Sequence, residues 1–171
     1  MSMSKLPRAL RIFLLTLSCI VIDQVSKFIA KQYLQPGDFY SFIGDTFRLQ
    51  YAENSGAFLG LGATLADPWR HLIFTVLVGI FLLALLIYIL RSGEQTWFAT
   101  VCLSLVCAGG TSNLIDRIAY DGRVVDFLNV GIGPLRTGIF NVADMAITFG
   151  ALLMLGESMR SSKSAPAAGQ Q

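Results

Sequence analysis

Two aspartates, Asp126 and Asp144, are the residues of this sequence with the clearest potential for chemistry. Asp144 lies inside an apolar run over residues 139–155, and Asp126 lies in the short polar stretch before that run. An ionisable group at membrane depth is costly to bury, so it points to function. Two carboxylates held close together can share one proton and activate a water molecule. The pair therefore suggests acid–base chemistry at the edge of a membrane.

Four apolar segments predict the helices that position these carboxylates. The chain has 171 residues, of which 54% are hydrophobic and 14% are charged, whereas a soluble domain carries about 25% charged residues. The apolar segments cover residues 10–30, 72–90, 97–115 and 139–155. Each approaches the ~20 residues that cross the hydrocarbon core of a bilayer. We therefore predict four transmembrane helices.

The distribution of basic residues predicts the orientation of the chain. Four spans place both termini on one side of the membrane, with longer loops, about 35–71 and 116–138, on the other side. Basic residues are densest near the span ends on the side of the termini, which predicts cytoplasmic termini. Residues 1–160 are expected to form a single domain, and 161–171 a disordered tail. The basic residues on the side of the termini are Lys5, Arg8, Arg11, Arg91, Arg160 and Lys163.

The first external loop has the pattern of a small sheet. Residues 46–51 alternate polar and apolar side chains, the period of a half-buried strand. The loop is rich in aromatic residues, which favour the membrane interface, and residues 54–56 (NSG) predict a turn. A membrane-anchoring loop without a substrate role is the alternative. The predicted fold is an all-α bundle of four transmembrane helices with a small extracytoplasmic β-sheet, a cradle, inserted between the first and second helices.

Other polar residues fall near the same outer face as the two aspartates. Asp23 and Lys27 are four residues apart, and Asn141 and Asp144 are three apart, so each pair shares one helix face. Asp23 and Lys27 predict a structural ion pair. Asp116 is equally consistent with a functional group and with the end of a helix at the water boundary. The polar residues of this face are Asp23, Lys27, Asn54, Asn113, Asp116, Arg117 and Asn141.

The sequence predicts no metal or cofactor. The three cysteines, Cys19, Cys102 and Cys107, lie in apolar segments without a CxxC motif, and His71 is the one histidine. A zinc site usually takes several histidine or cysteine ligands. The net charge of +2 is too small to suggest a nucleic-acid partner.

Five short motifs in order resemble the bacterial lipoprotein signal peptidase family, also called signal peptidase II. The resemblance covers nearly the whole chain apart from the tail. Ser112 is one departure, because the family usually has glycine there. The motifs are Asp23-x-x-x-Lys27, ENSGAF at 53–58, GGTSNLIDR at 109–117, VDF at 125–127 and FNVAD at 140–144.

This resemblance implies an aspartic endopeptidase of the bacterial inner membrane. Such an enzyme removes the signal peptide from prolipoproteins by cleaving just before the diacylglyceryl-modified lipobox cysteine. Asp126 and Asp144 match the catalytic pair of the family. The residues that match substrate-binding or supporting positions are Asn54, Gly56, Asn113, Arg117, Asn141, Asp23 and Lys27.

The resemblance also implies partners and a location. The partners are lipidated prolipoproteins, membrane lipid and cyclic peptide inhibitors of the globomycin type, and the expected state is a monomer without metal or cofactor. The active site is expected near the periplasmic face of a multi-pass inner-membrane protein.

Two alternatives stay open from the residues alone. Intramembrane acids also serve proton relays, so a small proton-coupled transporter is the main alternative. A transporter would carry acids through the depth of the bundle and show internal repeats, whereas these acids gather at one face. A non-enzymatic scaffold that docks through the aromatic loop is the other alternative, and it gives no reason for Asp144 inside a helix. Peptidase assays on variants of the acidic residues separate the three.

Overall fold

The computed structural model describes residues 6–56, 62, 64–92 and 95–164, with side chains up to residue 160. Four helical segments in this part of the chain are long and apolar enough to cross a membrane, which confirms the predicted spans. The second is continuous over α2, a π-helical segment η3, and α3. The segments are α1 (Arg8–Tyr33), α2 (Asp67–His71) with η3 (Leu72–Leu77) and α3 (Val78–Arg91), α4 (Trp97–Ala119) and α5 (Val142–Ser164).

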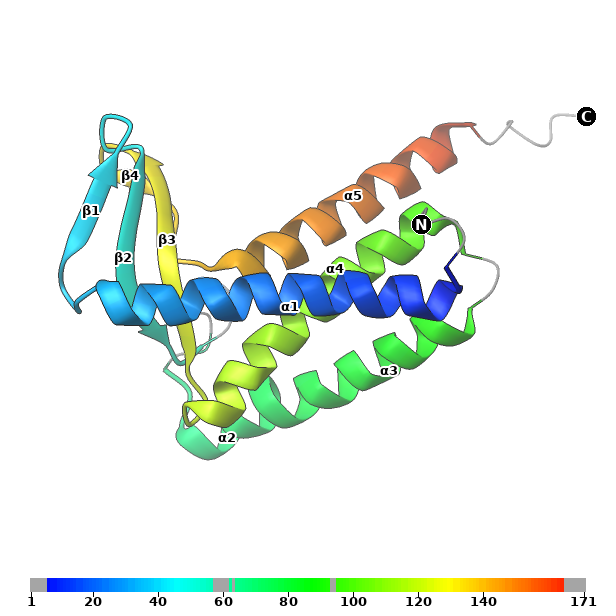
Figure 1. The fold of residues 1–171 in the computed structure, drawn as a ribbon, viewed down its shortest axis with the longest axis horizontal. Helices are drawn as coiled ribbons and strands as arrows, with labels where there is room; N and C mark the ends of the chain where they lie inside the picture. The colour runs from blue at the N-terminus through cyan, green and yellow to red at the C-terminus, as the bar shows by residue number, and fades with distance from the viewer. Residues whose placement is uncertain (1–5, 57–61, 63, 93–94, 165–171) are drawn as a thin grey trace, which may run out of the picture.

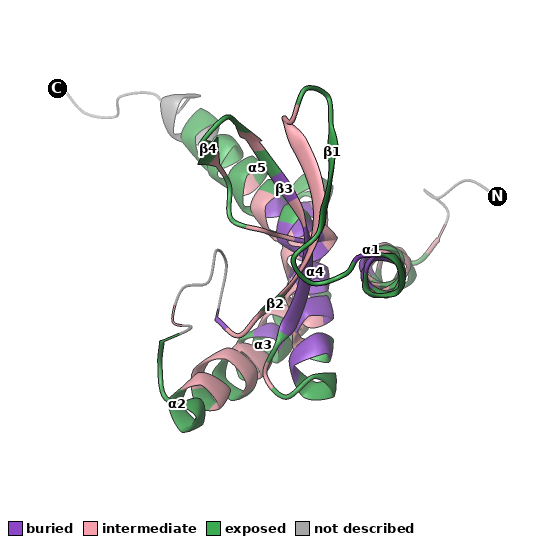
Figure 2. Cartoon of the chain, turned by 90° about the vertical axis from the view of Figure 1, so that its left-hand side faces the viewer, coloured by how far each residue is buried: buried purple, intermediate pink, exposed green. Residues whose placement is uncertain are grey.

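Helix α4 is the centre of the bundle, and α1, α3 and α5 all pack against it (Figures 1 and 2). Small residues allow α4 and α5 to approach closely. A side chain at Gly109 of α4 would collide with the backbone carbonyl of Ala143, and one at Gly150 of α5 would collide with that of Cys102. This contact places the first turn of α5 directly against the polar outer part of α4.

The outer surface of the bundle is apolar. Phe28, Ile80 and Phe149 are all more than half exposed, as suits helices that face lipid rather than water. Away from the sheet, α1, α3 and α4 pack through a small apolar cluster of Ile12, Ile89 and Cys107. The buried ionisable side chains gather near the sheet instead, as the sequence predicted.

A four-stranded antiparallel sheet lies across one end of the bundle (Figure 1). The sequence predicted a sheet in the first external loop, but half of the sheet comes from the second loop. The long pairing of β2 with β3 joins the two loops, and a bulge between Leu49 and Ala52 interrupts it. The strands, in the order β1-β2-β3-β4, are β1 (Phe39–Phe42), β2 (Phe47–Asn54), β3 (Val124–Ile132) and β4 (Leu135–Arg136).

Strand β3 is the part of the sheet that faces the helices most closely. Its first four residues, 124–127, are all buried, so both faces of the strand are covered there. Phe127 packs with Ala30 and Leu34 at the end of α1, which ties the sheet to the bundle. The chain then returns to the bundle as α5, which continues to Ser164. Helix α5 therefore enters the predicted tail, and residues 165–171 lie outside the described residues.

Candidate active site

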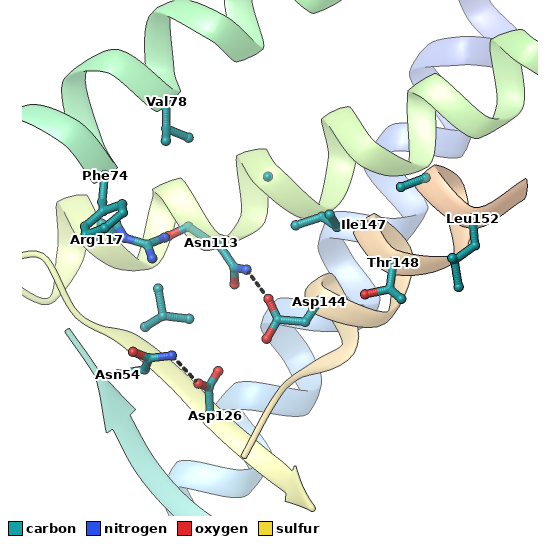
Figure 3. A pocket seen from close by; sticks show the side chains of 13 residues that line it. Asn54, Phe74, Val78, Asn113, Arg117, Asp126, Asp144, Ile147, Thr148 and Leu152 are labelled. Atoms are coloured by element: carbon teal, nitrogen blue, oxygen red, sulfur yellow. Dashed lines mark hydrogen bonds between the residues drawn. The ribbon is translucent and has the colours of Figure 1, made fainter. Parts of the chain in front are cut away.

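Asp126 and Asp144 line one cavity of about 480 Å³ between the sheet and the helices. Asp126 lies on β3 and Asp144 on the first turn of α5, and their exposed fractions are 1% and 8%. Figure 3 shows the two carboxylates pointing into the same space. The structure therefore brings the two predicted aspartates together, although they are 18 positions apart in the sequence.

Asn141 links the two aspartates. Its side-chain oxygen accepts the backbone N–H of Asp144 at 2.8 Å, and the Asp144 carboxylate accepts the backbone N–H of Asn141 at 3.2 Å. This reciprocal capping box begins α5. The Asn141 side-chain nitrogen lies 2.6 Å from Asp126 Oδ1 and 3.1 Å from Asn113 Oδ1. One amide therefore starts the helix of one carboxylate and donates to the other.

Two further asparagines complete the polar contacts of the aspartates. Asn54 Nδ2 donates to Asp126 Oδ2 at 3.0 Å, and Asn113 Nδ2 donates to Asp144 Oδ1 at 2.9 Å (Figure 3). Each carboxylate thus accepts two hydrogen bonds from described residues. An ionised carboxylate offers about four lone-pair sites, so both can still bind a water molecule or a substrate in the cavity.

Arg117 contributes a positive charge to the cavity wall. Its guanidinium donates to the Gly56 carbonyl at 2.7 Å and to the Asn113 carbonyl at 3.4 Å. Asn54 Oδ1 accepts the backbone N–H of Gly56 at 2.9 Å, so Gly56 is held from both sides. Asn54, Gly56 and Arg117, all predicted site residues, therefore fix the chain just after β2 at the edge of the cavity.

Behind the two aspartates, Asp23, Lys27 and Asp116 form a second buried charged cluster. Lys27 Nζ lies 2.7 Å from Asp23 Oδ2 and 2.9 Å from Asp116 Oδ2. The predicted ion pair of Asp23 and Lys27 is confirmed, and Asp116 joins it rather than ending a helix in water. None of the three lines the cavity.

The surroundings of Asp126 favour its protonated form. Burial raises the pKa of Asp126 to about 7, and the negative charge of Asp144 acts in the same direction. Hydrogen bonds from Asn54 and Asn141 and the charge of Lys27 lower the pKa in part. Asp126 can therefore hold a proton near neutral pH.

Comparison with known proteins identifies the family. Residues 15–160 match the family profile of signal peptidase (SPase) II. The protein named lipoprotein signal peptidase from Moorella thermoacetica is 38% identical over 141 residues, which cover 82% of this chain and 87% of the relative. The lipoprotein signal peptidase of Syntrophus aciditrophicus is 32% identical over 157 residues, which cover 91% of this chain and 97% of the relative. The chain belongs to the signal peptidase II family.

The fold agrees with this membership of the signal peptidase II family. A solved bacterial membrane enzyme, determined by the in meso method at 2.3 Å resolution, superposes with a TM-score of 0.79 at 27% identity and covers 94% of both chains. A second, at 1.9 Å resolution, gives a TM-score of 0.71 at 28% identity and covers 84% of this chain and 89% of that chain. The resemblance inferred from the five motifs is thus confirmed, and the chain is a multi-pass membrane protein of a peptidase family.

Sequence reasoning missed the apolar walls of the cavity of this signal peptidase II family member. Phe74 of η3 and Val78 of α3 form one wall, and Ile147, Ala151 and Leu152 of α5 form the other (Figure 3). In the sequence these residues cannot be distinguished from the many apolar residues that face lipid. Their role becomes visible only when the helices are placed.

Two polar partners of the buried aspartates were also missed. Gln24 Nε2 donates to Asp116 Oδ1 at 2.8 Å, and Ser112 Oγ donates to Asp23 Oδ2 at 2.7 Å. A glutamine within an apolar span is itself a signal of a buried partner.

Metal-ligating side chains do not gather in the part of the chain that the structure describes: no three histidine, cysteine, aspartate or glutamate residues are placed to hold an ion. His71 lies at the surface, 3.5 Å from Asp121. That catalysis needs no cofactor stays a prediction.

Proposed function

We propose that this protein is an aspartic endopeptidase that cleaves prolipoproteins just before the diacylglyceryl-modified lipobox cysteine. Family membership supports prolipoproteins as substrates. The observation that carries the aspartic mechanism is that Asp126 and Asp144 line one cavity with unfilled acceptor capacity. No other pair of ionisable residues in the described cavity offers both a general base and a general acid.

The two carboxylates would divide the chemistry between them. The ionised one accepts a proton from water while the water oxygen bonds to the scissile carbonyl carbon, and the protonated one donates its proton to the carbonyl oxygen. Breaking the C–N bond then requires a proton on the leaving nitrogen, which the carboxyl that received the water proton supplies. The other carboxylate takes up a proton from one of the two hydroxyl groups of the tetrahedral intermediate as the carbonyl re-forms. The pair ends with one proton, as it began.

Asp126 and Asp144 are called the dyad below. The electrostatics of the site support a dyad that carries a single proton. With a pKa of about 7, Asp126 keeps its proton below neutral pH. The pair therefore carries one proton at any pH below neutrality at which Asp144 is ionised. The start of α5 favours negative charge on Asp144. The protons belong to the coupled pair rather than to either residue alone.

The apolar walls suit a substrate that stays anchored in lipid. The cavity runs from Asp126 and Asp144 between η3 and α3 on one side and α5 on the other, and its walls there are apolar apart from Thr148. Acyl chains on the substrate cysteine could remain in contact with this surface while the peptide bond reaches the carboxylates. Contact with the walls would act mainly by positioning the scissile bond.

The position of the sheet supports a site at the outer face of the inner membrane. The start of α1 and the end of α5 lie at the opposite end of the bundle (Figure 1), and the positive-inside rule places that end in the cytoplasm. We further expect a monomer, and cyclic peptide inhibitors of the globomycin type should compete for the same cavity. A transporter is not favoured, because the family is one of peptidases.

The decisive experiment is cleavage of one prolipoprotein by the purified protein, with and without the diacylglyceryl group and in the same detergent. We expect the lipidated form to be cleaved just before the modified cysteine with at least tenfold higher kcat/KM. Equal kcat/KM for the two forms would contradict lipid recognition. Absence of cleavage of either form would contradict the proposed activity as a whole.

A further inference from the structure

The buried cluster of Asp23, Lys27 and Asp116 does more than pair charges. Lys27 Nζ touches both carboxylates, and it also donates to Asn113 Oδ1 at 2.8 Å. Asp23 and Asp116 are 0% and 1% exposed. The cluster joins α1 to α4 immediately behind the cavity. We call these three residues the charged triad.

Each carboxylate of the charged triad holds the backbone next to a dyad residue. Asp23 Oδ1 accepts the backbone N–H of Ala143, the residue before Asp144, at 2.8 Å. Asp116 Oδ2 accepts the backbone N–H of Val125, the residue before Asp126, at 3.1 Å. The two chain segments that carry the dyad, the start of α5 and strand β3, are therefore both fastened to one lysine through one carboxylate each.

Lys27 also determines how the asparagine amides point. An ammonium group can only donate, so Asn113 must turn its oxygen to Lys27 and its nitrogen to Asp144. The same oxygen accepts the Asn141 nitrogen at 3.1 Å, which orients Asn141 to donate to Asp126. A reversed Asn113 amide would present an N–H to Lys27 and an oxygen to the Asp144 carboxylate.

We propose that Asp23, Lys27 and Asp116 are positioning residues that set the separation of Asp126 and Asp144 and the orientation of the amides between them. This inference rests on the proposed function, because it assumes that Asp126 and Asp144 react. A purely structural ion cluster would need no contact with the peptide N–H groups beside both dyad residues. Here both triad carboxylates make that contact.

The charged triad also contributes to the field at the dyad. Among the described residues, the ionisable groups around the dyad are Asp23 and Lys27 of α1, and Asp116 and Arg117 of α4. The positive charge of Lys27 acts to lower the pKa of Asp126. Removal of Lys27 leaves two negative charges behind the dyad, so the dyad should hold its proton to higher pH.

The test compares Lys27→Met with Lys31→Met, which removes an exposed lysine one turn further along α1. Each variant is purified in detergent, its thermal unfolding is followed by tryptophan fluorescence, and kcat and KM for the lipidated prolipoprotein are measured across pH. We expect Lys27→Met to lower kcat by ~10²-fold, as a misplaced catalytic group does, with KM changed by less than about threefold. The alkaline limb of kcat should move up by about one pH unit. Lys31→Met should match the unaltered protein.

A second variant should shift the alkaline limb of kcat in the opposite direction. Asp116→Asn keeps an oxygen for the Val125 N–H but removes a negative charge, so its alkaline limb should move to lower pH. A folded Lys27→Met variant with unaltered kcat and pH profile would overturn the proposal. If Lys27→Met does not fold, an unmoved profile in Asp116→Asn overturns it instead. Failure of the proposed function is seen separately, as full activity in Asp126→Asn or as no cleavage by the unaltered protein.

Discussion

The site contains two pairs of aspartates in two different surroundings. Asp126 and Asp144 line the cavity and accept two hydrogen bonds each from described residues. Asp23 and Asp116 lie just behind them, away from the cavity. Each of these accepts three: Lys27, Ser112 and Ala143 donate to Asp23, while Lys27, Gln24 and Val125 donate to Asp116.

If Asp126 and Asp144 react and Asp23 and Asp116 support them, as proposed, then neither residue type nor burial distinguishes the reacting carboxylates from the supporting ones. All four carboxylates are buried. Those of the charged triad have three of their roughly four acceptor sites occupied, one of them by a cation. They do not line the cavity, so they can hold backbone in place but do not face a substrate there. The carboxylates of Asp126 and Asp144 still have free hydrogen-bond acceptor sites on the side that faces the cavity. Four predictions, from the largest expected effect to the smallest, test whether this division of roles is correct.

The largest effect is expected on activity at the dyad. Asp126→Asn and Asp144→Asn should each lower kcat by at least ~10⁴-fold, because neither amide can take up or release the required proton. The double variant should be scarcely worse than either single variant, as is usual for residues that act as a unit. Cleavage of the lipidated prolipoprotein is the assay, with thermal unfolding to show that each variant is folded. Activity above about a tenth of that of the unaltered protein in either variant would remove that residue from the dyad.

The second effect is on stability at the charged triad. Asp116→Ala leaves the Val125 N–H without its acceptor and Lys27 with one carboxylate fewer, which should lower the free energy of unfolding by roughly 3–5 kcal/mol. Asp126→Ala is the matched control and should cost much less, because its carboxylate is held near its neutral form. Chemical unfolding in detergent measures both. Equal losses in the two variants would show that the division between support and chemistry is wrong.

The sequence predicted the residues of the site better than their connections. The five motifs pointed to Asp126, Asp144 and the three asparagines, because each motif carries polar groups where apolar ones are expected. The structure brings these five side chains into hydrogen-bond contact, and their catalytic role stays a prediction. The role of Asp116 stayed undecided, since its partners Lys27 and Gln24 lie about 90 residues away and a single sequence does not reveal which helices touch.

The sheet was predicted only in part for a similar physical reason. The alternation at 46–51 is a local signal, and it correctly indicated β2. Asp126 was placed in a polar stretch, whereas it lies on β3 opposite Ala52 of β2. Its neighbours at 124–128 (VVDFL) have the β-branched and aromatic character of a strand, but the pairing of β2 with β3 is non-local.

The third effect is a pH dependence. The raised pKa of Asp126 means that the folded protein binds this proton more tightly than the unfolded chain. Its contribution to stability is full below the ordinary carboxyl pKa of about 3.8 and is lost as the pH rises to about 7. We expect the alkaline limb of kcat/KM at an apparent pKa of about 7, and Asp126→Asn should flatten the fall in unfolding temperature between pH 4 and 7.5. A limb more than about two units away would contradict this assignment.

The smallest expected effect is that of chelation. Carboxylates with unfilled acceptor capacity are also groups that bind divalent cations, so removal of metal tests whether the dyad acts through protons alone. Exhaustive dialysis against EDTA should leave kcat/KM unchanged within about twofold. A loss of activity that added zinc or magnesium restores would replace the two-carboxylate mechanism.

The bond between Asp23 and Ala143 has a consequence for the biosynthesis of the protein. It spans 120 positions in the sequence, from the first transmembrane helix to the start of the last. Membrane helices enter the bilayer in the order in which the ribosome produces them, so Asp23 is inserted long before its partner exists. A nascent chain with three helices in place has the charged triad and strand β3, but it lacks Asp144. On the proposed mechanism, the chain therefore gains its peptidase activity only when its final helix is in the membrane.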